Sequence, residues 1–266
     1  MPIIFVYEGD LALKKIEVYA HRGYSAVAPE NTVAAFRQAA EVKADGIELD
    51  VQLSRDGEVI VIHDETVKRT TGQKGKVKDL TLEELHRLDA GSWFSADWKG
   101  EKIPTLNEVL QLAAESGMKV NIELKNNKYP YPGLEEKVLQ SVEYFGLMKK
   151  TIISSFNHYS LRRVKERVPQ VETAILYMAS LFEPWNYTKR IGVASIHSYW
   201  PTTEKEMVEQ CHKLSLPVRP FTVNRVQEMR RLIRLGVDGV ITDKVEQFQA
   251  ELESQQEFDV VNMSGK

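Results

Sequence analysis

Cysteine is almost absent from this chain of 266 residues, which contains only Cys211. One thiol cannot form a disulfide within the chain or supply a site that needs several thiolate ligands. No apolar run approaches the roughly 20 residues that a membrane-spanning helix needs. Basic and acidic residues number 35 and 38, giving a net charge of −3. The chain therefore has no general basic field to attract nucleic acid, and we expect no nucleic-acid partner.

Signatures of several common protein classes are also missing. The sequence has no GxGxxG, Walker, HExxH or GxSxG motif, so readings as a nucleotide-binding protein, zinc protease or serine hydrolase lack their usual support. Its first ten residues show no cationic leader followed by a long apolar core, and we expect a cytoplasmic protein. The 42% hydrophobic and 27% charged residues are typical of a globular enzyme with a sizeable core.

Apolar runs of strand length alternate with amphipathic stretches along most of the chain. The candidate strands are 17–21, 46–53, 119–125, 151–155, 172–177, 193–199, 217–223 and 239–242. The candidate helices are 31–43, 105–117, 133–146, 158–168, 203–214 and 225–236, with a loop and a short helix between 177 and 193. About eight such alternations predict an α/β fold with a parallel sheet. Chain length and strand number favour a closed (β/α)8 TIM barrel over a doubly wound open sheet.

One interval departs from this alternation. After the second strand, Asp56-Gly57 is a strong hairpin signal, which predicts an antiparallel return ending at His63-Asp64. Residues from about 64 to 104 then form an inserted segment, with a short helix near 81–88. Loops of this kind carry function in barrel enzymes. We expect the insertion to belong to a single barrel domain spanning 1–266.

Acidic residues share one face of two neighbouring strands. Side chains alternate along a strand, so Glu48 and Asp50 point one way, and Glu123 shares its face with Asn121 and Lys125. The outer face of a barrel strand must be apolar to meet the helices, so these polar sets must face the interior. Three converging carboxylates either retain protons or surround a cation. All-oxygen ligands favour Mg²⁺ or Ca²⁺, with Mn²⁺ possible; the alternative is an ordinary buried ion pair.

Two histidines end apolar runs beside these acids. His21 closes the first strand, and His63 closes the hairpin return from the second. Imidazole has an ordinary pKa near 6.5 and exchanges protons in both directions at neutral pH. A metal with one acid and one base suffices to split a phosphate ester. Arg22 has a planar fork that suits a phosphate oxyanion, or alternatively an ion pair with Glu30.

Several ordered motifs together resemble the glycerophosphodiester phosphodiesterase family over roughly residues 17–248. They are His21-Arg22-Gly23, Pro29-Glu30-Asn31-Thr32, Glu48-Leu49-Asp50-Val51, His63-Asp64 and Glu123-Leu124-Lys125. The segments Phe221-Thr222-Val223-Asn224 and 236–243 also look like that family. The resemblance implies metal-dependent hydrolysis of a small glycerophosphodiester to sn-glycerol 3-phosphate and an alcohol, without stable membrane association.

The resemblance also implies residue roles. His21 and His63 match the general base and acid, and the metal ligands match Glu48, Asp50 and Glu123. Positions near the substrate match Arg22, Lys125, Glu30 and Phe221, the last standing where the family commonly has Trp. Attack by water and attack by the substrate's own hydroxyl, through a cyclic phosphate, both stay open, as does the oligomeric state.

Two rival functions fit the same barrel. A phospholipase-type relative acting on lysophospholipids or phosphoinositides needs an exposed apolar rim, which Trp93, Phe94, Trp98 and residues 181–185 could supply. A non-catalytic binding protein would be indicated by the loss of a histidine or a ligand acid, and all five residues are present.

Overall fold

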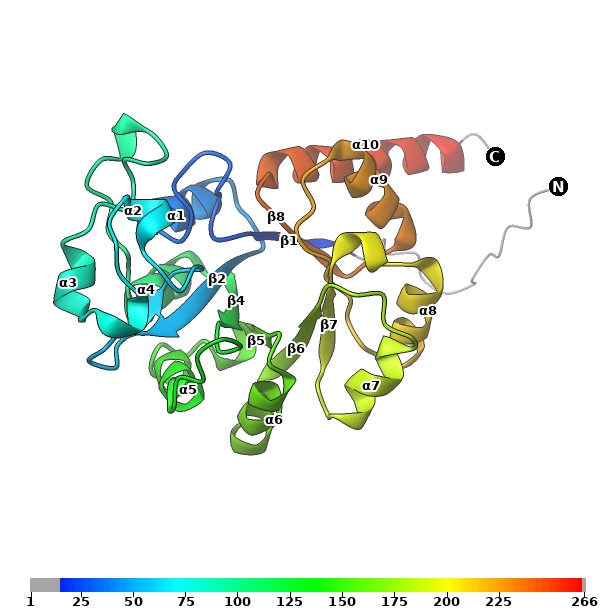
Figure 1. Cartoon of the computed structure of the whole chain (residues 1–266). Helices are drawn as coiled ribbons and strands as arrows, with labels where there is room; N and C mark the ends of the chain where they lie inside the picture. Colours follow the sequence, from blue (N-terminus) through cyan, green and yellow to red (C-terminus); the bar gives the residue numbers. More distant parts are fainter. Residues whose placement is uncertain (1–14, 265–266) are drawn as a thin grey trace.

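Parallel strands form the centre of the computed structural model, which describes residues 15–264 and the side chains of 15–255 (Figure 1). The strands are β1 (Glu17–Ala20), β2 (Gly46–Leu53), β4 (Lys119–Leu124), β5 (Thr151–Ser155), β6 (Glu172–Tyr177), β7 (Ser195–Ser198) and β8 (Gly239–Thr242). Their order in the sheet is β7-β6-β5-β4-β2-β1-β8, and every one of these pairs is parallel.

An extended segment, residues 217–223, closes the sheet between β7 and β8. Val218 forms an isolated parallel bridge with Ile196 of β7, and Phe221 forms one with Tyr199, directly after β7. On the other side the Val223 N–H donates to the Ile241 carbonyl at 3.0 Å. The predicted strand therefore occupies the expected position without a continuous ladder, because Pro217 and Pro220 have no N–H to donate. The closed (β/α)8 barrel is confirmed, and the open-sheet alternative is wrong.

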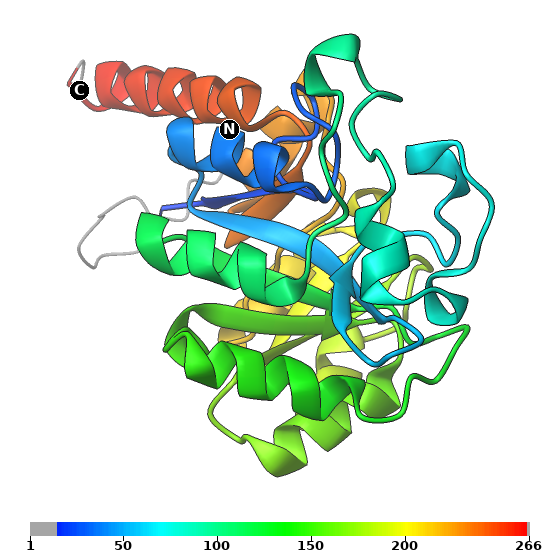
Figure 2. The ribbon, with the colours of Figure 1, turned by 90° about the vertical axis from the view of Figure 1, so that its left-hand side faces the viewer.

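Helices cover the outside of the barrel. They are α1 (Val33–Glu41), α4 (Leu106–Ser116), α5 (Leu134–Tyr144), α6 (His158–Arg167), α7 (Pro184–Arg190), α8 (Lys205–Lys213), α9 (Val226–Leu235) and α10 (Val245–Ser264). Short 3₁₀ turns are η3 (Met148–Lys150) and η4 (Trp200–Thr202). Figure 2 shows α1, α4 and α5 side by side outside the strands. The six helices predicted from amphipathic stretches lie within two residues of their expected ends.

Local sequence sets where several helices begin and end. The Thr32 side chain caps α1 by accepting from the Ala35 N–H. Thr105 and Glu108 form a reciprocal capping box at the start of α4. Gly236 ends α9 in the left-handed region with φ 70°, a conformation that glycine adopts without a Cβ clash.

Strand alternation divides the buried residues into two sets. Ile47, Leu49 and Val51 point outward into the main core beneath the helices, where each is fully buried. Burying a side chain of this size contributes about 1.5–3 kcal/mol. A smaller apolar cluster, which includes Tyr19 and Ile241, fills the barrel interior. Polar side chains on the inward face of β2 and β4 therefore lie above an apolar layer, away from bulk water.

The inserted segment follows the hairpin strand β3 (Val59–Val61), which pairs antiparallel with β2. It contains α2 (Lys68–Thr71), η1 (Val77–Asp79), α3 (Leu82–His86) and η2 (Ala96–Trp98). A separate apolar cluster, with Ile60 and Leu85 fully buried, holds the segment against the hairpin. The predicted hairpin and short helix are thus both present in the structure.

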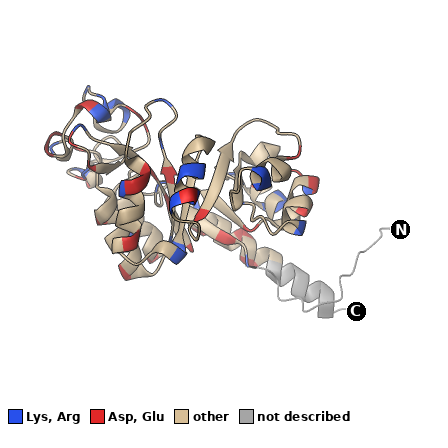
Figure 3. Cartoon of the chain, turned by 90° about the horizontal axis from the view of Figure 1, so that it is seen from below, with Lys and Arg blue, Asp and Glu red and all other residues tan. Residues whose placement is uncertain are grey.

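Charges of both signs are interspersed over the helices and loops (Figure 3). In the described part of the chain, no helix combines the length and the apolar character needed to cross a membrane.

Candidate active site

Three carboxylates converge where β2 and β4 lie side by side. Glu48 and Asp50 come from β2 and Glu123 from β4, and Asp50 is the direct register partner of Glu123. One carboxylate oxygen from each lies within 4.8 Å of the others. Glu48 and Asp50 are 3% and 1% exposed. Because these acids lie on the inward faces of two paired strands, their side chains meet at one point inside the barrel.

Charge crowding perturbs this triad. Burial, together with Asp50 and Glu123, raises the pKa of Glu48 well above its ordinary value. Burial and Asp50 likewise raise the pKa of Glu123. Two carboxylates about 5 Å apart repel by about 3 kcal/mol at an effective dielectric constant near 20, so three ionised groups need compensation. A hard divalent cation bound by oxygen ligands supplies it, and the donor set fits such an ion.

Two side-chain cations flank the triad. Arg22 Nε lies 3.4 Å from Asp50 Oδ2, and Lys125 Nζ lies 3.7 Å from Asp50 Oδ1. Although burial opposes it, these two cations and His63 lower the pKa of Asp50. Lys125 also donates to Glu123 at 2.8 Å. The ordinary ion pair considered for Glu123 is therefore present, within the same cluster as the other two acids.

The backbone of Arg22 also enters the site. Its N–H donates to Glu48 Oε2 at 2.9 Å, while its guanidinium donates to Glu30 at 2.8 Å. Arg22 adopts φ 56° and Asn31 φ 55°, so the chain turns sharply between β1 and α1. Asn31 then donates from its side chain to Asp50 Oδ2 at 3.0 Å. The loop after β1 thus holds two of the three carboxylates in place.

His21 follows β1 and faces the triad. Its Nδ1 lies 2.6 Å from Asp243 Oδ1, and its Nε2 lies 4.0 Å from Glu48 Oε2. Asp243 is in turn bound by Ser25 and Asn224. Despite burial, the hydrogen bond with His21 lowers the pKa of Asp243. An anionic Asp243 fixes the ring so that Nε2 is the nitrogen directed at the carboxylates.

His63 approaches from the hairpin, after β3. Its Nδ1 lies 2.8 Å from Asp64 Oδ1. Asp64 also accepts two hydrogen bonds from Arg69, and Arg69 and His63 together lower the pKa of Asp64 to about 2, although burial opposes the shift. Arg69 donates on its other side to Glu30. The inserted segment is therefore joined to the loop after β1 by charged hydrogen bonds.

A small cavity of about 20 Å³ lies among these groups. Its polar wall consists of His21, Glu48, Asn121, Glu123 and Ser154. Leu176, Phe221 and Ile241 form the apolar wall. Phe221 is held edge-on against Phe156, with ring centroids 6.0 Å apart. The Phe221 ring therefore presents an apolar surface to the cavity. This is the property expected of the position, because the family that the sequence resembles commonly has Trp there.

Three residues of the site were missed by the sequence reasoning. Asp243 was noted only as the end of a motif, although its position after β8 places it beside the end of β1 in a closed barrel. Asn224 follows the closing segment 217–223 and contacts Asp243. Arg69 lies within the insertion, and no spacing rule connects it to Glu30, which is 39 residues away.

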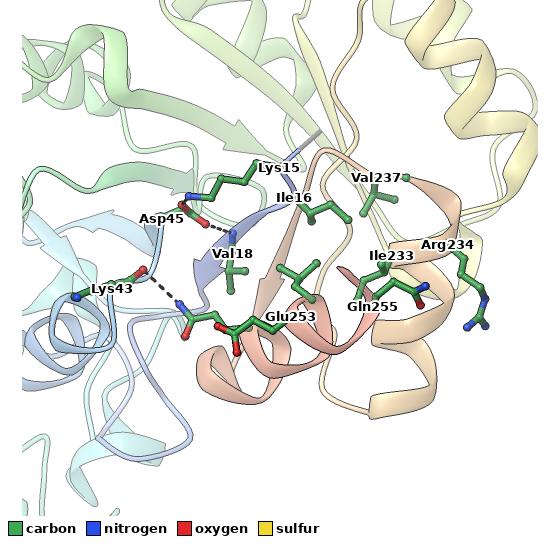
Figure 4. Close-up of a pocket in the computed structure, with 13 residues that line it drawn as sticks. Lys15, Ile16, Val18, Lys43, Asp45, Ile233, Arg234, Val237, Glu253 and Gln255 are labelled. Atoms are coloured by element: carbon green, nitrogen blue, oxygen red, sulfur yellow. Dashed lines mark hydrogen bonds and ion pairs between the residues drawn. The ribbon is translucent and has the colours of Figure 1, made fainter. Parts of the chain in front are cut away.

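A wider pocket of about 720 Å³ lies at the opposite end of the barrel (Figure 4). Apolar side chains such as Ile16, Ile233 and Val237 line it, together with charged groups such as Lys15 and Arg234. It contains no cluster of acids or histidines comparable to the triad among the described residues. The small cavity at the strand ends, where barrel enzymes place their active sites, is therefore the candidate active site.

Comparisons with known proteins give matches over most of the chain. The model of the "Glycerophosphoryl diester phosphodiesterase family" matches residues 21–247. A glycerophosphodiester phosphodiesterase of Caldanaerobacter subterraneus subsp. tengcongensis is 49% identical over 232 residues, which are 87% of this chain and 96% of that protein. One from Bacillus altitudinis is 44% identical over 85% of this chain and 94% of its own length.

A solved structure is also similar. It is an Oleispira antarctica phosphodiesterase in complex with the product sn-glycerol-3-phosphate, with a TM-score of 0.80 and 30% identity. The match covers 89% of this chain and 96% of that one. The likeness thus extends over nearly the whole barrel.

Proposed function

The chain belongs to the glycerophosphoryl diester phosphodiesterase family, and we propose that it hydrolyses glycerophosphodiesters to sn-glycerol 3-phosphate and an alcohol. The observation that carries this proposal is the buried triad with an imidazole directed at it and a second imidazole close by. The product-bound Oleispira antarctica relative supports the choice of substrate.

Glu48, Asp50 and Glu123 would hold one divalent cation, Mg²⁺ or Ca²⁺ with Mn²⁺ possible. Such an ion, when bound, offsets the negative charge that develops on phosphate oxygens. Arg22 and Lys125 adjoin the triad and would bind the phosphate as well. Glu30 would orient Arg22 through their hydrogen bond, and Phe221 would form the apolar side of the substrate site.

His21 and His63 would act as general base and general acid. Each ring has Nδ1 beside a carboxylate, Asp243 or Asp64, which leaves Nε2 for proton exchange. One imidazole takes the proton of the attacking hydroxyl or water, and the other gives a proton to the departing alkoxide, so the total protonation of the pair is conserved. The assignment of base and acid, and the choice between water and a substrate hydroxyl, stay open.

We also propose that residues 1–266 form one cytoplasmic domain that includes the insertion at about 64–104. The hydrogen bonds of Arg69 to Glu30 support the single domain, because they join the insertion to the barrel. Residues 1–14, 265 and 266 lie outside the described part of the chain.

The lipid-acting alternative has one observation in its favour. Phe182 is 91% exposed and Met178 58% exposed in the loop after β6. Because β6 is parallel to β4, this loop lies on the same side of the barrel as the triad. The insertion offers less apolar surface to a lipid, because its Trp93 is engaged within the protein. The Trp93 indole N–H donates to the Ala90 carbonyl, and the Trp93 ring packs against Phe94. This loop could contact an acyl chain, so the alternative belongs in the same test.

The test is release of glycerol 3-phosphate from glycerophosphocholine with Mg²⁺, Ca²⁺, Mn²⁺ or EDTA. We expect release with at least one ion and none with EDTA. Turnover of the ethanolamine and glycerol esters should be similar, because Arg22 and Lys125 would bind the phosphate that all three esters share. Lysophosphatidylcholine in a parallel assay should be a poor substrate. Preferential cleavage of that lipid would favour the alternative, and no cleavage of any diester with any ion would refute both.

A further inference from the structure

Two polar side chains of the small cavity have no hydrogen-bond partner among the described residues. They are Asn121, whose Oδ1 is buried, and Ser154, whose Oγ is buried. Their residues are 1% and 0% exposed. An unpaired buried polar atom costs about 1–3 kcal/mol, so two such atoms facing one cavity indicate a polar occupant.

Strand register places these side chains beside the triad. Asn121 is the register partner of Glu48, and Ser154 is the partner of Glu123. All four line the same cavity. Its volume of about 20 Å³ exceeds the roughly 10–15 Å³ that one water molecule requires.

We propose that Asn121 and Ser154 hold one ordered water molecule against Glu48 and Glu123 and thereby fix the orientation of these two carboxylates. The water donates one hydrogen bond to Asn121 Oδ1 and one to a carboxylate oxygen, and it accepts one from the Ser154 hydroxyl. This gives it three partners, which is typical of buried water. Asn121 and Ser154 are thus positioning residues for the metal ligands, an inference that rests on the proposed function.

The first test is Mn²⁺ affinity measured by calorimetry, without substrate. Removing partners behind metal ligands typically weakens affinity 10–100-fold, so Asn121→Ala and Ser154→Ala should each raise the Mn²⁺ Kd by about that factor. Since both side chains hold the same water, the double variant should lose little more than the weaker-binding single variant.

Thr173→Val provides a matched control. Thr173 Oγ1 is also buried without a hydrogen-bond partner, but Thr173 does not line the cavity. Because Ala174 belongs to the interior cluster, the side chain of the preceding Thr173 points to the outer face of β6. This variant should leave the Mn²⁺ Kd unchanged, and thermal unfolding of all variants identifies any that fail to fold.

A high-resolution crystal structure of the wild type provides the second test, which does not depend on metal binding. We expect a density peak within hydrogen-bond distance of Asn121 Oδ1 and Ser154 Oγ. Absence of that peak, or losses in Mn²⁺ affinity that multiply in the double variant, would overturn the proposal. A wild type that binds Mn²⁺ while the variants bind it equally well refutes only the water site. A wild type that binds no divalent ion refutes the proposed function instead.

Discussion

Replacing His63 with alanine should lower kcat by about 10²–10⁴-fold, the usual contribution of a general acid or base. His21→Ala should have an effect of the same size. Each imidazole is oriented by an aspartate and is directed at or near the triad, so its loss removes one proton transfer. Both side chains are partly exposed, at 18% for His21 and 32% for His63, and the fold should persist. Steady-state kinetics at saturating metal measures the effect.

His86→Ala is the matched control for these two variants. His86 lies in α3 of the insertion, and its Nε2 lies 3.9 Å from Glu108 Oε2. This variant should retain wild-type kcat. Retention of most activity by both His63→Ala and His21→Ala would contradict the acid–base roles, while a loss in only one would limit the proposal to that residue.

Replacing Glu123 with glutamine should weaken metal binding before it affects the reaction. The amide keeps the shape of the side chain but removes one charge, so the Mn²⁺ Kd should rise by more than about 10-fold, because even partners behind the ligands contribute that much. Excess metal should then restore part of the lost rate. The variant should unfold at a temperature no lower than that of the wild type, because burial and Asp50 already disfavour the charge at this position.

Glu135→Gln is the corresponding control. Glu135 is also buried, at 5% exposed, but it lies in α5 and accepts hydrogen bonds from Ser160 and Arg163. Its replacement should lower the unfolding temperature, because it removes the charge paired with Arg163, and should leave the Mn²⁺ Kd unchanged. Equal Mn²⁺ binding by the wild type and Glu123→Gln would show that Glu123 is only the partner of Lys125.

The sequence was most informative where strand alternation and burial act together. Glu48 and Asp50 alternate with Ile47, Leu49 and Val51, and only one of these sets can face the helices. That constraint alone predicts that the acids face the interior of the barrel. The boundaries of β2, β5, β6 and β8 also followed from apolar runs flanked by polar or turn residues.

Other features depend on contacts that local patterns do not encode. The closing segment 217–223 was predicted as a strand, but Pro217 and Pro220 reduce its pairing to isolated bridges. Asp243 lies 222 residues from His21 and meets it only because β8 pairs with β1. Arg69 reaches Glu30 from an insertion whose path no periodicity determines.

The position of a bound ion provides the most direct test of the central claim. Anomalous diffraction from crystals of the Mn²⁺-loaded protein should show one strong peak at about 2.0–2.4 Å from oxygens of Glu48, Asp50 and Glu123, a range typical of hard divalent cations with oxygen ligands. Both imidazoles should face that peak. A strong peak elsewhere, or none at the triad in a protein that cleaves glycerophosphocholine with Mn²⁺, would contradict the account.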